Sequence, residues 1–338
     1  MVSTQHVKGA NLPSFAFLTT RYVLLAAHPD IEPDEDNAIP TPSEAKILVV
    51  DLEATSNETV DLVDLDYLCA FHYPALNDDH DVIDVSIRSD PGPHWRPNPS
   101  LKVPFSVARE DRLIVVTLSI IRMHVHFSLI SLVPSSTFRS AIASLSPGET
   151  RRDFEWTEWG PHGSRMFPAP STHTAVWVCY VYGMQLALAR RTGSRQVIIT
   201  FDFNPLSIRR ARCDPAGVQE LENEKLVTAG TELSDTGIFR ERVCTELPHW
   251  LRVTQAIGGE GAEGEGHFDA AMLSEDSLIM VSSVSAFLRR RVFGWADGGL
   301  CAAISYQEVQ GVDLLTSTLR ILASHAGCCF VSSLWFAS

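Results

Sequence analysis

The run LIVVTLSII at Leu113–Ile121, followed almost at once by HVHFSLISLV at His124–Val133, is the strongest pair of apolar segments in the chain. Runs of this length that are rich in Val and Ile predict β-strands, and we expect these two to be central strands of one sheet. Similar runs recur from Phe15 to Val281, each closed by Pro, Gly, Asn or Asp. The sequence therefore predicts an all-β fold, a β-propeller-like array of short antiparallel strands, complete or incomplete, with few short helices.

Other strands are predicted outward from this pair. Tight hairpins are expected where two apolar runs are separated by a few turn residues, and single strands where Val or Ile alternates with polar residues. The expected strand segments are Phe15–Thr19, Tyr22–Ala27, Lys46–Leu52, Val60–Leu68, Val82–Ile87, Thr174–Leu188, Gln196–Phe203, Phe268–Leu273 and Ser277–Val284. Ser135–Leu145, after Pro134, is the best helical candidate, because its apolar side chains fall on one helical face.

The spacing of apolar runs and turn residues along the chain predicts one large domain and a tail. Residues 1–288 are expected to form the propeller-like β domain, which includes a mobile acidic loop at 30–43, a proline-rich connection at 90–104 and a Gly/Glu loop at 258–266. Residues 289–338 lack the regular pattern of short apolar runs and turn residues, and we expect them to form an atypical C-terminal tail. The sequence does not decide whether this tail is ordered.

Charge and composition limit the partners. The 338 residues have a formal net charge of −14, which repels phosphate backbones and anionic lipid, so neither nucleic acid nor a membrane is an expected partner. The longest apolar stretch, Ala175–Ala189, is shorter than the roughly twenty residues of a membrane-spanning helix. Seven cysteines without a C-x-x-C pair favour a reducing compartment, and Met1–Pro13 has no secretory signal. We therefore expect a cytoplasmic or nuclear protein.

Sequence patterns that could indicate a catalytic, cofactor-binding or metal-binding site are weak in this chain. Gly259–Gly264 satisfies G-x-G-x-x-G, but Glu260 and Glu263 would face a pyrophosphate, so a flexible acidic loop is the better interpretation. His124 and His126 share one face if both lie on a strand, which can bind a metal, but no third ligand is near and solvent-facing histidines are favoured. Neither H-E-x-x-H nor G-x-S-x-G nor G-x-x-x-x-G-K-[ST] occurs in the sequence. The sequence thus predicts no catalytic, cofactor-binding or metal-binding residue, no cofactor and no enzyme.

Charged and aromatic groups leave alternatives open. Asp78–Asp81 is interpreted as a solvated turn. Three basic clusters either balance local acidic residues or meet acidic or phosphorylated partners: Arg190, Arg191 and Arg195; Arg209, Arg210 and Arg212; Arg289, Arg290 and Arg291. Most of the large aromatic residues are expected in the core, with one or two free to anchor a partner: Trp156, Trp159, Trp177, Trp250, Tyr180 and Tyr182.

An ordered series of short motifs carries a resemblance to a known family. The motifs are Arg88-Ser89-Asp90-Pro91, Trp95 with Pro97-Asn98-Pro99, Val103-Pro104-Phe105, Asp111–Leu118, Phe127 with Val133–Phe138, Trp159-Gly160-Pro161 with Arg165-Met166-Phe167, Tyr182–Gln185, Asp202-Phe203-Asn204-Pro205 with Arg209-Arg210, and Phe239 with Leu247-Pro248. Over roughly Phe15 to Val281 the chain resembles the F-box-containing proteins of mushroom-forming fungi. The resemblance implies a propeller-like region that follows the F-box and recruits a target to a cullin-type ubiquitin ligase.

The F-box itself is expected to be missing. Leu12-Pro13 is similar to the opening of an F-box, but Phe15–Ala27 continues as a hairpin and no helical module of about forty residues follows. Binding of the ligase adaptor is therefore doubtful, and the expected partner is a protein target of unknown identity.

The sequence thus favours a non-catalytic protein-interaction module, with the ubiquitin-ligase substrate receptor lacking its F-box as its particular form. Two alternatives remain open. One is a propeller-type hydrolase or lyase that acts on a carbohydrate or another small substrate through paired carboxylates. The other is a truncated gene product without independent function.

Overall fold

The computed structural model describes residues 7–8, 14–27, 45–54, 60–61, 64–96, 98–100, 110–169, 180–192, 195–213, 223–233, 237–255, 270–275, 277–284, 287–296 and 299–303. The acidic loop at 30–43, the Gly/Glu loop at 258–266 and the tail beyond residue 303 lie outside these residues, as does Trp177. The predictions for those segments stay predictions.

The first sheet has five strands in the order β10-β6-β4-β3-β2. Its strands are β2 (Phe15–Phe17), β3 (Tyr22–Ala27), β4 (Lys46–Asp51), β6 (Cys69–His72) and β10 (Arg152–Phe154). Neighbours are antiparallel except β10, which runs parallel to β6. The predicted hairpin at the start of the chain is confirmed as β2 and β3. Beside this sheet, β1 (Val7–Lys8) pairs in parallel with β5 (Val60–Asp61).

The second sheet contains the two strongest apolar runs. It has the order β11-β9-β8-β7, with β7 (Asp81–Arg88), β8 (Leu113–Arg122), β9 (Val125–Pro134) and β11 (Arg165–Pro168), and every pair is antiparallel. The two runs pair along their whole length, from Leu113 opposite Pro134 to Arg122 opposite Val125. The predicted central hairpin is therefore confirmed.

The third and fourth sheets follow in chain order. The third is β12-β13-β14-β18-β15, made of β12 (Val181–Tyr182), β13 (Gln185–Thr192), β14 (Arg195–Asp202), β18 (His249–Gln255) and β15 (Glu224–Val227). The fourth is β19-β20-β21-β22, made of β19 (Ala270–Leu273), β20 (Ser277–Val284), β21 (Phe287–Ala296) and β22 (Gly299–Ala303). A small pair, β16 (Thr231–Glu232) and β17 (Cys244–Thr245), lies between β15 and β18 in the chain.

Two basic clusters lie on strands. Strand β21 extends across residue 289, where the expected C-terminal tail begins, because three consecutive arginines interrupt the apolar pattern without ending the strand. Arg190, Arg191 and Arg195 lie on the paired ends of β13 and β14, in which Thr192 lies opposite Arg195.

Three short helices complete the described elements: α1 (Ser135–Ala143), α2 (Trp156–Gly163) and α3 (Pro205–Cys213). Only α1 was predicted. The sequence of α2 contains a proline and two glycines, which lower helix propensity, but Trp156 and Trp159 bury one face of it in the core. Tertiary packing thus stabilises a helix that local propensity does not favour.

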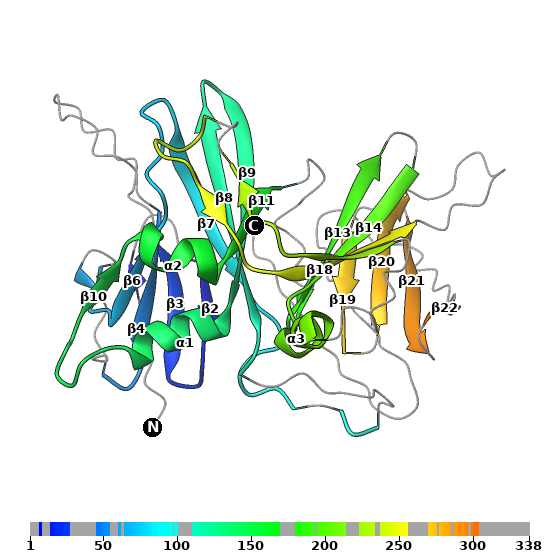
Figure 1. Cartoon of the computed structure of the whole chain (residues 1–338), viewed down its shortest axis with the longest axis horizontal. Helices are drawn as coiled ribbons and strands as arrows, with labels where there is room; N and C mark the ends of the chain where they lie inside the picture. The colour runs from blue at the N-terminus through cyan, green and yellow to red at the C-terminus, as the bar shows by residue number, and fades with distance from the viewer. Residues whose placement is uncertain are drawn as a thin grey trace.

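The sheets stack face to face in chain order, from left to right in Figure 1. Even-numbered residues of β8 such as Ile114 and Val116 pack into a core shared with the first sheet, α1 and α2, whereas Leu113 and Val115 pack against the third sheet. The third sheet packs against the fourth through Ala187, Ile198, Ala271, Leu273 and Leu278. Because β8 is buried on both faces, its sequence is a continuous apolar run rather than an alternating one.

The architecture agrees with the predicted class at the coarser level. The described protein is mostly β, with several antiparallel sheets and three short helices. Among the described residues the sheets do not close into a barrel or a propeller ring.

Candidate functional site

The tip of the β8–β9 hairpin is the most exposed apolar feature among the described residues. The turn consists of two residues, Met123 and His124, between the paired residues Arg122 and Val125. The side chains of Met123 and Val125 are 78% and 55% exposed. The tip therefore presents two apolar side chains to solvent at the end of a long hairpin.

The backbone of this turn is strained. Met123 has φ 44° and His124 has φ 69°, the left-handed region that two-residue hairpin turns require. Asn and Gly adopt this region readily, whereas a residue such as Met costs on the order of 1 kcal/mol there. The sequence has thus kept an exposed Met and His at positions where Asn and Gly would be more stable.

Arg122, the strand residue next to the turn, is held by a chain of polar contacts. The Nε of Arg122 lies 2.8 Å from a carboxylate oxygen of Asp79, and the other oxygen lies 2.6 Å from Nδ1 of His80. The side chain of His80 is 1% exposed, and its ring centroid lies 6.2 Å from that of Phe127 on β9. Partial desolvation works to raise the pKa of Asp79, but the hydrogen bond with His80 and the charge of Arg122 outweigh it and lower the pKa.

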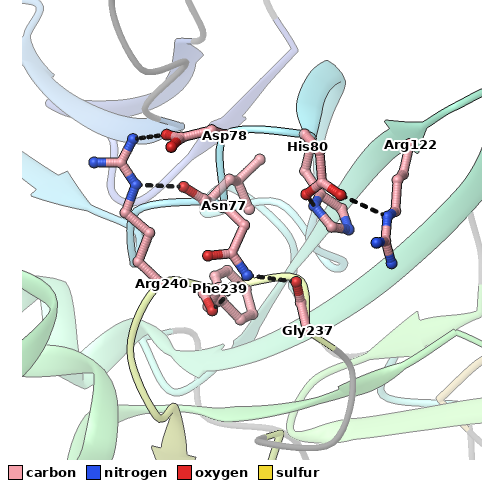
Figure 2. A network of polar contacts seen from close by, with 9 residues as sticks. Asn77, Asp78, His80, Arg122, Gly237, Phe239 and Arg240 are labelled. Atoms are coloured by element: carbon pink, nitrogen blue, oxygen red, sulfur yellow. Dashed lines mark hydrogen bonds and ion pairs between the residues drawn. The ribbon is translucent and has the colours of Figure 1, made fainter.

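The loop that carries Asp79 and His80 is itself clamped by a segment about 160 residues further along the chain. Asn77 donates from Nδ2 to the carbonyl oxygens of Gly237 (2.5 Å) and Phe239 (3.1 Å). Arg240 donates from Nε to the carbonyl of Leu76 at 2.9 Å and pairs with Asp78. Figure 2 shows these contacts on one side of the loop and the His80–Arg122 side on the other. The strand end next to the turn is therefore connected to the Asp79 loop and, through it, to the segment around Gly237.

The interpretation of Asp78–Asp81 as a solvated turn was wrong for His80, which is buried, and incomplete for Asp78 and Asp79, which bind arginines. No local signal distinguishes this loop from an ordinary acidic turn, since its partners come from β8 and from the segment around Gly237. The hint in the sequence was Phe239, which belongs to one of the family-like motifs and packs into the first core.

Several other motif residues fix one sheet to another. Arg112 is 1% exposed, and its guanidinium donates to the carbonyls of Pro91 (2.8 Å), Phe17 (2.8 Å) and Leu18 (2.6 Å). These carbonyls belong to the β2–β3 turn and to the connection after β7. Burial lowers the pKa of Arg112, and Asp90 raises it less strongly. Arg112 therefore joins the first two sheets through backbone carbonyls.

A second buried arginine joins β11 to β17 and to the connection between β15 and β16. Arg165 is 4% exposed and donates to the carbonyls of Ala229 (2.9 Å) and Thr245 (3.3 Å). Close by, the ring of His249 stacks on Phe203 at 5.1 Å between centroids. Burial, reinforced by the charge of Arg165, lowers the pKa of His249 to about 4. A neutral, buried imidazole of this kind is a structural group.

The structure separates the two histidines considered as a metal pair. His124 lies in the turn and only His126 lies on β9, so the geometry of two strand residues on one face does not apply. Both side chains are exposed. Within the described ranges no group of three or more His, Cys, Asp or Glu side chains could hold a metal ion. The G-x-G-x-x-G segment at 259–264 lies outside the described residues.

The aromatic residues fall as the sequence predicted where they are described. Trp156, Trp159, Trp250 and Tyr180 are buried, and Tyr182 is partly buried. Of the basic clusters, Arg209, Arg210 and Arg212 are exposed on α3, and Arg190 is exposed on β13. For the third cluster only the backbone of β21 is described.

The fold and the hairpin tip define a mostly β protein of stacked antiparallel sheets that presents an apolar loop to solvent. The chain matches no protein family, and neither a curated protein nor a solved structure is similar to it. None of the described helices is both long enough and apolar enough to cross a lipid bilayer.

Proposed function

We propose that this chain is a non-catalytic protein-interaction module, similar to the target-recognition region of a fungal F-box protein, and that the β8–β9 tip contacts the target. The observation that carries the proposal is the strained turn with its two exposed apolar side chains. Backbone strain that is retained at an exposed site indicates a function for the residues that cause it. A flexible, polarisable Met is a common anchor at protein interfaces.

The contacts that hold the strand end next to the turn support this function. A contact residue that is already held in place loses less conformational entropy on binding than one on a free loop. Arg122 is fixed by Asp79, and the loop of Asp79 is fixed in turn by Asn77 and Arg240. The tip is thus presented in one position to an incoming protein.

The same proposal includes a propeller-like arrangement. Each of the last three described sheets begins with a strand that contacts the sheet before it, as β7 contacts β2 and β3, β12 contacts β8, and β19 contacts β12 and β13. Successive antiparallel sheets packed in chain order are the unit of a propeller. In this arrangement the β8–β9 turn lies at one end of a blade, where propellers present their binding loops.

The enzymatic alternative has less support. Two of the buried ionisable side chains, Arg112 and Arg165, donate to backbone carbonyls. A reducing compartment, cytoplasmic or nuclear, and recruitment to a ubiquitin ligase remain parts of the proposal, the latter only if an F-box acts together with this chain.

A variant with a relaxed turn separates binding from folding. Met123→Asn with His124→Gly replaces both residues by those that favour φ above zero, so the free energy of unfolding should rise by about 1–2 kcal/mol while the apolar anchor is lost. The control Phe15→Ser removes a similarly exposed apolar side chain from the first sheet. Each of the three proteins, the wild type, the double tip variant and Phe15→Ser, is used to capture partners from fungal lysate. Quantitative proteomics then compares the proteins that each one captures.

The expected result is a protein captured by the wild type and by Phe15→Ser but lost with the tip variant, although that variant is at least as stable. Capture that is equal for all three would refute the role of the tip. Turnover of a small substrate by the purified chain, with no capture that depends on the tip, would refute the interaction function.

A further inference from the structure

Helix α3 is fixed on the third sheet with one face outward. Asn204 accepts a hydrogen bond from the backbone N of Leu206 at 3.0 Å, and Pro205 stands at the first helical position, so the motif Asp202–Pro205 starts the helix. Ile208 and Ala211 are buried against Trp250. The residues opposite these two must therefore face solvent.

That outward face combines an apolar side chain with arginines. Leu206 is 69% exposed, and Arg209 and Arg210 are exposed three and four residues later, so all three lie on one helical face. Arg212 is also exposed at the border of this face. We call Leu206, Arg209, Arg210 and Arg212 the α3 face.

The arginines of the α3 face have no ion pair within the described part of the chain. By contrast, Arg122 binds Asp79, Arg240 binds Asp78 and Arg252 binds Glu224 at 2.9 Å. In a protein with a net charge of −14, three neighbouring arginines without an acidic partner form a local positive site in a negative surround.

Helix stability explains only part of this arrangement. Arg210 and Arg212 lie in the last turn, where cations interact favourably with the helix dipole. That interaction does not require Arg209, which lies about one turn before the end of the helix, and it does not require an exposed leucine. The unexplained pair is thus Leu206 with Arg209.

We propose that the α3 face binds an acidic peptide segment of a partner protein, one that carries carboxylates and at least one apolar side chain. The arginine guanidinium groups match carboxylates in a bidentate fork, and the leucine supplies apolar contact beside them. The proposal rests on the interaction function proposed above and names the chemistry of a partner at a second surface, separate from the hairpin tip. Negative charge elsewhere on the protein repels such a peptide, which restricts it to this face.

The test measures binding of a fluorescein-labelled synthetic peptide with the repeat Leu-Glu-Glu by fluorescence anisotropy, using the full chain. Arg209→Glu with Arg210→Glu should weaken binding by tenfold or more, on the order expected when charge-assisted contacts become repulsive. The matched control Arg96→Glu with Arg190→Glu makes the same change in net charge at exposed arginines outside α3 and should weaken binding much less. Leu206→Ser should weaken binding of this peptide but not of a peptide in which serine replaces leucine.

Two further arms decide what the α3 face recognises. The first arm uses a peptide with phosphoserine in place of glutamate. If this peptide binds more tightly at the same arginines, the α3 face recognises phosphorylated peptides in preference to carboxylates. Single-stranded DNA as a competitor tests general attraction of anions. If DNA displaces the peptide as well as unlabelled peptide does, or if both double variants lose binding equally, the proposal is overturned.

The two proposals fail in different ways. If the α3 variants lose nothing while the Met123→Asn, His124→Gly variant still loses its captured partner, the interaction function stands and the α3 face is wrong. If capture from lysate does not depend on the tip and no peptide binds, both are wrong. Thermal unfolding of each variant, monitored by circular dichroism, confirms that loss of binding is not loss of fold.

Discussion

Acid should destabilise this protein through one histidine. His249 is 4% exposed, its ring stacks on Phe203, and its Nδ1 lies 3.5 Å from the carbonyl of Leu247, a distance too long for a strong hydrogen bond. Burial and the neighbouring charge of Arg165 disfavour the imidazolium, so the pKa is about 4 in the folded protein. In the unfolded chain a histidine has its ordinary pKa of about 6.5.

The sign and size of the effect follow from these two values. Above about pH 6.5 the imidazole is neutral in both states, and its contribution to stability is complete. Between about pH 6.5 and 4 the unfolded chain binds the proton and the folded protein does not, so the free energy of unfolding falls as the pH falls. The total loss is about 3 kcal/mol, since each pKa unit corresponds to about 1.4 kcal/mol.

The assay is urea denaturation at pH 7 and at about pH 4.5, for the wild type and for His249→Phe. Phe keeps the stacking on Phe203 and removes the proton, so the wild type should lose about 2–3 kcal/mol more than the variant over this interval. The carboxylates titrate in both proteins, so their contribution cancels when the two losses of stability are compared. Identical pH dependence in the wild type and His249→Phe would refute the reasoning.

Two predictions concern packing and buried charge, and both are measured as free energies of unfolding. Arg112→Met should cost about 3–5 kcal/mol, because it leaves two buried carbonyls and one partly buried carbonyl without their donor, whereas Arg139→Met at a solvent-exposed ion pair should cost about 1 kcal/mol or less. Equal costs would contradict the role given to Arg112. Gly160→Ala should destabilise by about 1–3 kcal/mol although Ala is the better helix former, since the new Cβ would lie 2.3 Å from the ring of Trp156. Gly92→Ala, where the new Cβ meets nothing within 4 Å, is the control, and a stabilising Gly160→Ala would show that Trp156 can move.

Strands could be predicted where burial imposes a simple pattern on the sequence. β8 and β9 are buried on both sides of their sheet, so they form long apolar runs, and β7 alternates because one of its faces is partly exposed. Helices were harder to predict from the sequence. In α3 the buried side chains are only Ile208 and Ala211, and the remaining residues have the polar, basic composition of a loop. Such a helix depends on its contact with Trp250, which lies about forty residues away in the chain.

The candidate site was hidden for a related reason. The sequence predicts only that Met123 lies between two strands. Its exposure to solvent could not be predicted, because exposure depends on which parts of the fold pack over the turn. The burial of His80 depends on β8, β9 and the segment around Gly237. A sequence pattern records the neighbours of a residue along the chain, whereas these contacts join residues that are far apart in it.

The residues of the short sequence motifs divide into two groups once their contacts are known. Arg112 and Arg165 hold separate parts of the chain together through buried hydrogen bonds, and Trp159 joins α2 to β6, so a change at any of them would disturb the fold. Arg209 and Arg210 make no ion pair within the described residues and face solvent. The helix dipole favours Arg210 in the last turn of α3, whereas Arg209 lies before that turn. Internal packing therefore explains Arg209 least, which makes it the most informative member of the α3 face to test.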